Sequence, residues 1–259
     1  MPSPTHAPTG RDMLRAMAVA LARGALRFLS SRLPVRSMGS ALVVAPHPDD
    51  EALGCGGTVA LLSDNGVVVN LIVVTDGSAS HPNHPAVPPE RLASIRRAEA
   101  LAVAGRLGIS PDNVFFAGAR DGTLSLLSAR EATRLAEAIS SEIRRTRPGS
   151  ILLPFRRDRS DDHEATFVLV TRALALSSAK ARVLEFPIWA WRNPISLVAA
   201  AFAARAVWSV DISSVLARKA GAIGTYASQV RPIPPDSSPI LSSRFLSNFV
   251  VTEEYFLEQ

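Results

Sequence analysis

The feature that most constrains the fold is an alternation of short apolar runs and helical patterns that begins at residue 41. Two of the runs are rich in valine, a composition typical of strands buried on both faces of a sheet. The apolar runs are Ala41–Ala45, Val67–Thr75, Val114–Ala117 and Ser150–Pro154, and the helical patterns cover Glu90–Leu107, Ser128–Arg145 and a segment from about Glu164. This order predicts a doubly wound α/β fold whose sheet is mostly parallel at its centre.

Composition and charge exclude several classes of protein. Of the 259 residues 47% are hydrophobic and 20% charged, so the chain can form a core. A single cysteine, Cys55, excludes a disulfide scaffold and fits a reducing, cytoplasmic compartment. The net charge of +5 comes from residues 1–40, which contain six arginines and one aspartate. The rest of the chain is neutral and lacks the clustered basic and aromatic residues that nucleic acids require, so we expect no nucleic-acid partner.

The N-terminal segment, residues 11–29, has the pattern of a basic amphipathic helix. Its apolar arc of about 80° contains Leu14, Met17, Leu21, Ala25 and Phe28. Two apolar residues, Val19 and Leu26, lie on the face that carries the arginines. The arginines also interrupt the apolar sequence, so no uninterrupted apolar segment here is long enough to span a bilayer. The helix could dock on its own domain, or it could lie on an anionic surface such as the inner membrane. We divide the chain into a 1–36 extension and one domain, 37–259.

An acidic cluster with a histidine follows the first predicted strand in the sequence Ala45-Pro-His-Pro-Asp-Asp-Glu51. Adjacent carboxylates repel each other, and a divalent cation relieves that repulsion. The three acidic residues Asp49, Asp50 and Glu51 could instead stabilise the N-terminal dipole of the following helix. That role would not account for a histidine, His47, between two prolines.

A second charged cluster, Arg156–His163, follows the strand that ends at Pro154. Alone it would be a solvated loop, but the carboxyl ends of parallel strands face one crevice. Two imidazoles and one carboxylate suit zinc with a water in an open position, although the same set could hold iron(II). Such a metal lowers the pKa of bound water towards about 7 and needs a nearby base.

Residues 41–58, ALVVAPHPDDEALGCGGT, resemble the first motif of the LmbE-like, PIG-L-type N-deacetylase family. Further similar segments follow in the same order between about residues 40 and 230: Thr75–Ser78, Arg96–Glu99, Asp121-Gly122, Asp162-His163, Lys219-Ala220 and Ser228-Gln229. The resemblance implies a Rossmann-like three-layer sandwich. It also implies hydrolysis of an N-acetyl group on an N-acetylglucosamine-type sugar, either a small molecule or a lipid-linked conjugate.

The family's functional residues map onto individual positions of this chain. The resemblance implies that His47, Asp50 and His163 bind zinc or another divalent metal, and that Asp49 is the general base. It further implies that Arg96 and Asp121 contact the sugar. The oligomeric state is left open.

One position departs from the family pattern, because the usual His-Pro-Asp-His is Ser160-Asp-Asp-His163 here. The resemblance implies that the first histidine stabilises the oxyanion and assists proton transfer to the leaving amine. Ser160 can donate a hydrogen bond but cannot become an imidazolium. Losing an oxyanion donor typically costs about 10²–10³ in rate, so we expect a slowed enzyme. The alternative is a weakened family member that binds a sugar or lipid-linked glycan without efficient turnover.

Several remaining features carry open hypotheses. His81 or His84, in the loop after Thr75, could supply the missing imidazole near the substrate, or both could be ordinary loop residues. Trp189 and Trp191 could belong to the core or stack on a sugar. The apolar stretch Ile195–Val210 is interpreted as a buried helix or a lid, with a membrane-facing role as the alternative.

Overall fold

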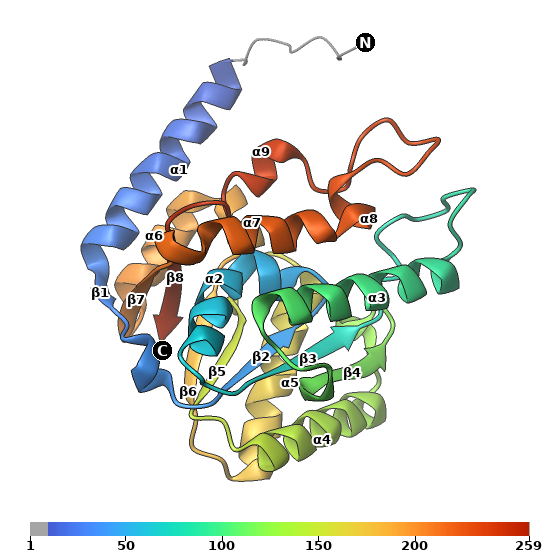
Figure 1. The fold of residues 1–259 in the computed structure, drawn as a ribbon, viewed down its shortest axis with the longest axis horizontal. Helices are drawn as coiled ribbons and strands as arrows, with labels where there is room; N and C mark the ends of the chain where they lie inside the picture. Colours follow the sequence, from blue (N-terminus) through green and yellow to red (C-terminus); the bar gives the residue numbers. More distant parts are fainter. Residues whose placement is uncertain (1–9, 259) are drawn as a thin grey trace.

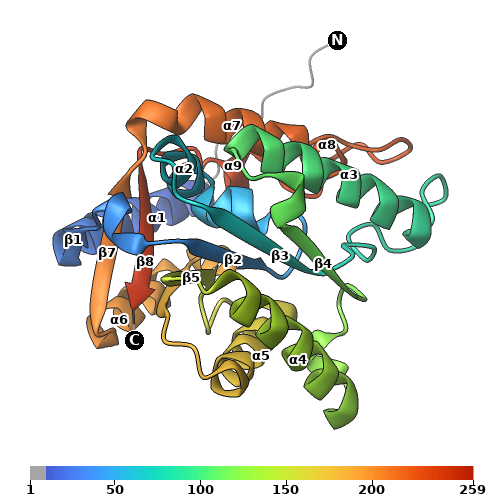
Figure 2. The ribbon, with the colours of Figure 1, turned by 60° about the horizontal axis from the view of Figure 1, so that its bottom comes forward.

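The computed structural model describes residues 10–258, which form one eight-stranded sheet with helices on both faces (Figures 1 and 2). The strands are β1 (Ser30–Arg32), β2 (Ala41–Ala45), β3 (Val69–Thr75), β4 (Val114–Ala119), β5 (Ser150–Pro154), β6 (Arg182–Phe186), β7 (Ala206–Asp211) and β8 (Glu253–Glu258). Their order is β1-β7-β8-β6-β5-β2-β3-β4, and only β8 runs antiparallel to its neighbours. The predicted α/β class and mostly parallel centre are confirmed.

The helices form the two outer layers. They are α1 (Gly10–Leu29), α2 (Asp50–Asp64), α3 (Pro89–Leu107), α4 (Ala129–Thr146), α5 (Asp161–Ser177), α6 (Pro194–Ala203), α7 (Leu216–Thr225), α8 (Ala227–Val230) and α9 (Ser243–Leu246), with short 3₁₀ segments at Val35–Met38, Pro111–Asn113, Leu124–Leu126, Trp189–Arg192 and Ser213–Val215. Figure 2 shows α2, α3 and α7 on one face of the sheet and α4 and α5 on the other.

Side chains of the central strands alternate between the two faces, as the period of two in a strand requires. In β2, Ala41, Val43 and Ala45 join the core under α2 and α3. Leu42 and Val44 join the second core under α4 and α5. Because both faces are covered, every residue of β2 is buried, which explains why its sequence is apolar throughout.

Two predicted helices differ in the structure. The segment Ile195–Val210 is not one helix, because α6 ends at Ala203 and β7 begins at Ala206. Alternating residues of β7 pack inward while its backbone pairs with β1 and β8. The helix expected from about Glu164 begins at Asp161, where Asp161, Asp162 and Glu164 complement its N-terminal dipole.

The N-terminal helix α1 docks on the protein through a face other than its apolar arc. Ala22 and Leu26 are buried, and α1 packs beside α6. The strand β1 follows directly and pairs with β7, which fixes the rotation of the helix. Leu14, Met17, Leu21 and Phe28 are consequently exposed. Within residues 10–258, no helix has both the length and the hydropathy that a membrane crossing requires. Residues 1–9 of the predicted extension lie outside the described part of the chain.

The helix α2 is interrupted where it passes over the sheet. Cys55, which is buried as a small hydrophobe, has non-helical backbone angles. The amides of Gly57 and Thr58 therefore donate to the Glu254 carboxylate, at 2.8 and 2.7 Å. A Cβ at Gly57 would lie 2.5 Å from Ile212 Cδ1, so only glycine permits this close packing of helix on sheet.

The Glu254 carboxylate also accepts a hydrogen bond from Lys219 Nζ at 2.7 Å, and both side chains are buried. Removing one partner of a buried ion pair typically costs about 3–5 kcal/mol, because the other charge is left uncompensated. We therefore expect Glu254→Gln to lower the free energy of unfolding by that amount in denaturant titrations.

Glu253→Gln is the matched control for this prediction. Glu253 is the neighbouring residue of the same strand, and it pairs with Arg32, which is largely exposed. Such pairs are worth less than about 1 kcal/mol. Equal losses in the two variants would contradict the role given to the buried pair.

Candidate active site

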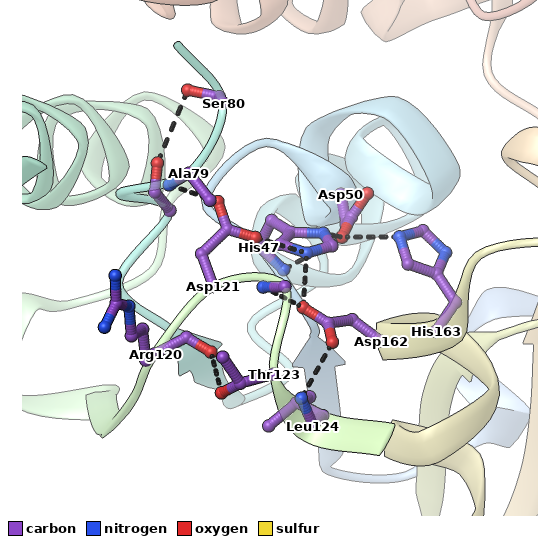
Figure 3. A network of polar contacts seen from close by, with 12 residues as sticks. His47, Asp50, Ala79, Ser80, Arg120, Asp121, Thr123, Leu124, Asp162 and His163 are labelled. Carbon is purple, nitrogen blue, oxygen red and sulfur yellow. Dashed lines mark hydrogen bonds and ion pairs between the residues drawn. The ribbon is translucent and has the colours of Figure 1, made fainter. Parts of the chain in front are cut away.

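The polar residues of the two sequence clusters meet at the carboxyl ends of the central strands. His47 follows β2, Asp121 follows β4, and Asp162 and His163 lie in the first turn of α5, which follows β5. Figure 3 shows these side chains pointing toward one another from the segments that follow β2, β4 and β5. Because β2 lies between β5 and β3, the site occupies the switch point where ligands of such sheets bind.

The His47 ring has a carboxylate near each of its nitrogens. Nδ1 lies 3.2 Å from Asp50 Oδ2, and Nε2 lies 3.1 Å from both Asp121 Oδ1 and Asp162 Oδ2. Burial lowers the pKa of His47, but hydrogen bonds with Asp121, Asp162 and Asp50 outweigh burial and raise that pKa well above its usual value.

The His163 ring is buried and held from one side. Its Nδ1 lies 2.7 Å from Asp158 Oδ2. Its Nε2 faces Asp50 Oδ2 at 3.2 Å and has no hydrogen bond within residues 10–258. Burial lowers the pKa of His163, but Asp50 and Asp158 raise it to about 9. An unpartnered buried nitrogen that faces a carboxylate is the geometry expected of a metal ligand.

Two groups of side chains place their ligand atoms close enough to hold an ion, and they share His47. In the first, His47, Asp50 and His163 present two imidazoles and one carboxylate. In the second, Asp121 and Asp162 already accept backbone hydrogen bonds, from Ala79 at 2.9 Å and from Gly122 at 2.7 Å. Asp50 of the first group likewise accepts the His47 backbone amide, at 2.9 Å. The first group fits a metal better because it contains a second imidazole, whose Nε2 has no hydrogen bond within residues 10–258. The carboxylates of the second orient His47 through Nε2, as outer-shell partners of ligating histidines do.

The carboxylate of Asp49 lies beside this group in a strained backbone. Asp49 has φ 134°, a region rarely adopted by residues with side chains. Arg96 holds its carboxylate at 3.1 Å and also donates to the Pro48 carbonyl. Burial raises the pKa of Asp49 to about 7, although Arg96 lowers it. A carboxyl group with this pKa can both accept and return a proton near neutral pH.

A second buried acid supports the strained turn. Glu51 accepts a hydrogen bond from the Asp49 backbone amide at 3.2 Å and another from the Tyr226 hydroxyl at 2.5 Å. Burial raises the pKa of Glu51 to about 7, although the Tyr226 hydrogen bond lowers it. Two segments thus hold the turn that carries Asp49. Arg96 of α3 contacts it directly, and Tyr226, which lies between α7 and α8, contacts it through Glu51.

The two residues expected to contact a sugar have protein partners here. Arg96 is 3% exposed, and its guanidinium contacts Asp49, Pro48 and Gly77. Asp121 is engaged with His47 and the Ala79 amide. Both lie at the site, so these contacts give them positioning roles, and their contact with a substrate stays a prediction.

Ser160 and the loop histidines have different surroundings. Ser160 is the N-cap residue of α5, the helix that carries His163, and its side chain makes no capping hydrogen bond. His81 Nδ1 lies 3.1 Å from Ser80 Oγ, and His84 Nε2 lies 3.2 Å from the Ile233 carbonyl. Neither histidine pairs with the cluster in the described part of the chain, and the replacement of the missing imidazole stays a prediction.

The two tryptophans after β6 differ in burial. Trp191 is buried under the guanidinium of Arg23, so its interpretation as a core residue is confirmed. Trp189 is half-buried, stacks on Phe245 with ring centres 4.7 Å apart and also contacts Arg192. A stacking role for Trp189 against a sugar stays a prediction.

Two functional carboxylates, Asp158 and Asp162, escape sequence reasoning based on ligand spacing. Asp158 is fully buried, and it accepts hydrogen bonds from three consecutive amides, those of residues 188–190, at 2.9–3.0 Å. It also fixes His163. Asp162 fixes His47 and accepts amides from Gly122 and Leu124. Both lie in the charged cluster Arg156–His163, and Asp162 also belongs to the segment Asp162-His163 that resembles the family, but neither signal indicates which histidine each carboxylate contacts.

Known proteins resemble this chain in sequence and fold. Residues 42–174 match the family described as PIG-L, GlcNAc-PI de-N-acetylase. The diacetylchitobiose deacetylase of Thermococcus kodakarensis is 29% identical over 201 residues, covering 76% of this chain and 72% of that protein. A Bacillus cereus protein named "Probable N-acetyl-alpha-D-glucosaminyl L-malate deacetylase 2" is 27% identical over 199 residues, covering 76% and 86%. The N,N'-diacetylchitobiose deacetylase structure from Pyrococcus horikoshii, 21% identical, matches with a TM-score of 0.64 over 99% of this chain and 95% of that one, which shows a shared fold.

Because Asp158 holds His163, replacing Asp158 should weaken metal binding. Asp158→Asn keeps the size of the side chain but removes the charge that holds His163 in one tautomer. Loss of such an outer partner typically weakens metal binding about 10–100-fold. Competition with a chromophoric zinc chelator measures the change.

Asp161→Asn is the control, since Asp161 is an exposed residue of the same segment. Thermal unfolding of the metal-free proteins separates lost affinity from lost structure. Unchanged zinc affinity in a folded Asp158→Asn protein would contradict the positioning role.

Proposed function

Because the chain belongs to the PIG-L family, we propose that it is a zinc-dependent deacetylase that hydrolyses the N-acetyl group of an N-acetylglucosamine-type sugar or glycoconjugate. The observation that carries this proposal is the buried Nε2 of His163, which has no hydrogen bond in the described part of the chain and faces Asp50 in the group that also contains His47. Two imidazoles and a carboxylate with an open position suit catalytic zinc. The names of the curated relatives, both deacetylases of acetylated amino sugars, support the same substrate class.

The chain's own residues can perform the proton transfers of amide hydrolysis. A divalent metal held by His47, Asp50 and His163 would polarise the amide carbonyl and make water a stronger nucleophile. The Asp49 carboxylate takes a proton from the attacking water and returns it to the nitrogen as the C–N bond breaks. Water and the acetamide thus become acetate and a free amine. Arg96 keeps the carboxylate in place throughout.

Ser160 determines how fast this reaction proceeds. A hydroxyl can donate one hydrogen bond to the oxyanion but supplies no positive charge, whereas an imidazolium supplies both. The Ser160 side chain makes no capping hydrogen bond to α5, so the hydroxyl is not occupied at the helix end. We infer a slowed enzyme, and the deacetylase relatives support turnover over binding alone.

If Asp49 is the general base, replacing it should lower turnover and leave metal binding unchanged. Asp49→Asn keeps the shape of the side chain and removes the proton acceptor. We expect acetate release from N-acetylglucosamine conjugates to fall about 10²–10⁴-fold, while elemental analysis finds the zinc content of wild type. Wild-type turnover in this variant would exclude Asp49 as the base.

Because Ser160 stands where the family pattern has a histidine, restoring that histidine should raise the activity. Ser160→His restores a potential acid and oxyanion donor, and we expect acetate release to rise about 10²-fold or more. Asp161→His, which places an imidazole at the next residue, is the control and should not raise the rate. Acetate release by the Ser160→His protein alone would favour the binding-only alternative. Equal rates in wild type and Ser160→His would show that Ser160 does not limit the chemistry.

A further inference from the structure

A pocket of about 390 Å³ lies between α6 and the segment that joins β5 to α5. A volume of this size is typical of sites that bind small molecules. Phe155 and several alanines of α6 form an apolar wall, and the polar residues that line the pocket are Arg157, Arg159, Glu164, Asn193 and Ser196. The three proposed metal ligands are not among its lining residues. The pocket is therefore distinct from the metal site.

The segment after β5 contains three arginines, and they differ in their partners. Arg156 pairs with the buried Glu185 carboxylate at 2.6 Å. Arg157 and Arg159 are exposed, and their guanidinium groups form no ion pair within the part of the chain that the structure describes. Among the described residues, Glu164 is the one carboxylate that lines the pocket, and its Oε1 accepts a hydrogen bond from the Arg159 backbone amide at 3.2 Å. The lining thus has two guanidinium groups and one carboxylate, an excess of positive charge.

The backbone that carries these two arginines is held in place by the rest of the protein. Asp158 lies between Arg157 and Arg159, and its carboxylate accepts the amides of residues 188–190 and contacts His163. Arg159 has φ 60°, a left-handed backbone conformation that favours glycine. Unfavourable backbone conformations are concentrated at functional sites. A glycine at position 159 would be less strained, so the arginine there indicates a role for its side chain.

We propose that this pocket binds a phosphate group through Arg157 and Arg159. Guanidinium groups bind phosphate with paired, charge-assisted hydrogen bonds. The three acceptor oxygens of a phosphate ester engage two guanidinium groups, whereas a carboxylate is fully occupied by one. The apolar wall fits the organic part of such an ester. The phosphate belongs either to the acetylated substrate, a case that rests on the proposed function, or to a separate small molecule.

Titration calorimetry of the zinc-loaded full chain with inorganic phosphate tests the site without turnover. We expect Arg157→Gln to weaken phosphate binding at least about tenfold, because a charge-assisted hydrogen bond is lost. Arg159→Gly should weaken binding as much, although glycine suits the left-handed backbone and preserves the fold of the segment. Wild-type phosphate affinity in either variant, or no phosphate binding by the wild-type protein, would overturn the proposal.

Arg130→Gln and Arg134→Gln are the matched controls, because each removes one exposed arginine of α4 and the same single charge. Losses of phosphate affinity as large in these controls would show that net charge alone attracts the anion, and would overturn the assignment to the pocket. Glu164→Gln should have the opposite effect and bind phosphate at least about twofold more tightly, because a carboxylate that repels the anion is removed. Unchanged or weaker binding in that variant would contradict the position of the anion in this pocket.

Acetate release distinguishes the two sources of phosphate. If the substrate carries it, kcat/KM for N-acetylglucosamine 1-phosphate should exceed that for N-acetylglucosamine at least about tenfold, and Arg157→Gln should reduce this ratio. If a separate molecule carries it, the ratio should be near one, and inorganic phosphate should not compete with either sugar. Competition by phosphate that survives Arg157→Gln would place the anion at the metal and overturn the proposal. Calorimetry measures the pocket even where no acetate is released, so failure here is distinguishable from failure of the proposed function.

Discussion

Burial of charge is the constraint on which the site depends. Two imidazoles and several carboxylates are enclosed at the ends of the central strands, and such groups are stable only when each has a partner. Asp158 and Asp162 meet this requirement by accepting backbone amides from loops that follow other strands. Each then fixes one nitrogen of a histidine. The remaining nitrogens, His47 Nδ1 and His163 Nε2, are both directed towards Asp50. The geometry of a metal site follows from this pairing.

The helix α2 also depends on buried charges that have partners. The strained turn at Asp49 persists because Arg96 and Glu51 hold it from two sides. The first half of α2 must then pass close to the sheet, and the helix is kinked at Cys55, just before the amides of Gly57 and Thr58. Glu254 of β8 accepts both of them, with Lys219 compensating its charge. A buried pair more than thirty residues apart in sequence therefore supports the helix that begins at the site.

The N-terminal helix shows how packing can oppose a sequence pattern. Its larger apolar arc would be expected to face the core. The pairing of β1 with β7 and the small side chain of Ala22 place another face inward instead. The apolar residues Leu14, Met17, Leu21 and Phe28 are left on the outer face of the helix. The candidate site and this outer face thus have different origins, the first from strand ends and the second from a helix docked at the sheet edge.

Local patterns in the sequence determined the alternation of strands and helices from β2 to α5, the bounds of β2 and β5, and the position of the acidic motif after β2. They suffice because side-chain periodicity and turn residues act within a few positions of the chain. Family resemblance added the roles of His47, Asp49, Asp50 and His163. Only the tertiary structure decided that Asp158 orients His163, that residues 195–210 divide between α6 and β7, and which face of α1 is exposed. Each of these depends on contacts between segments far apart in sequence, which no local pattern contains.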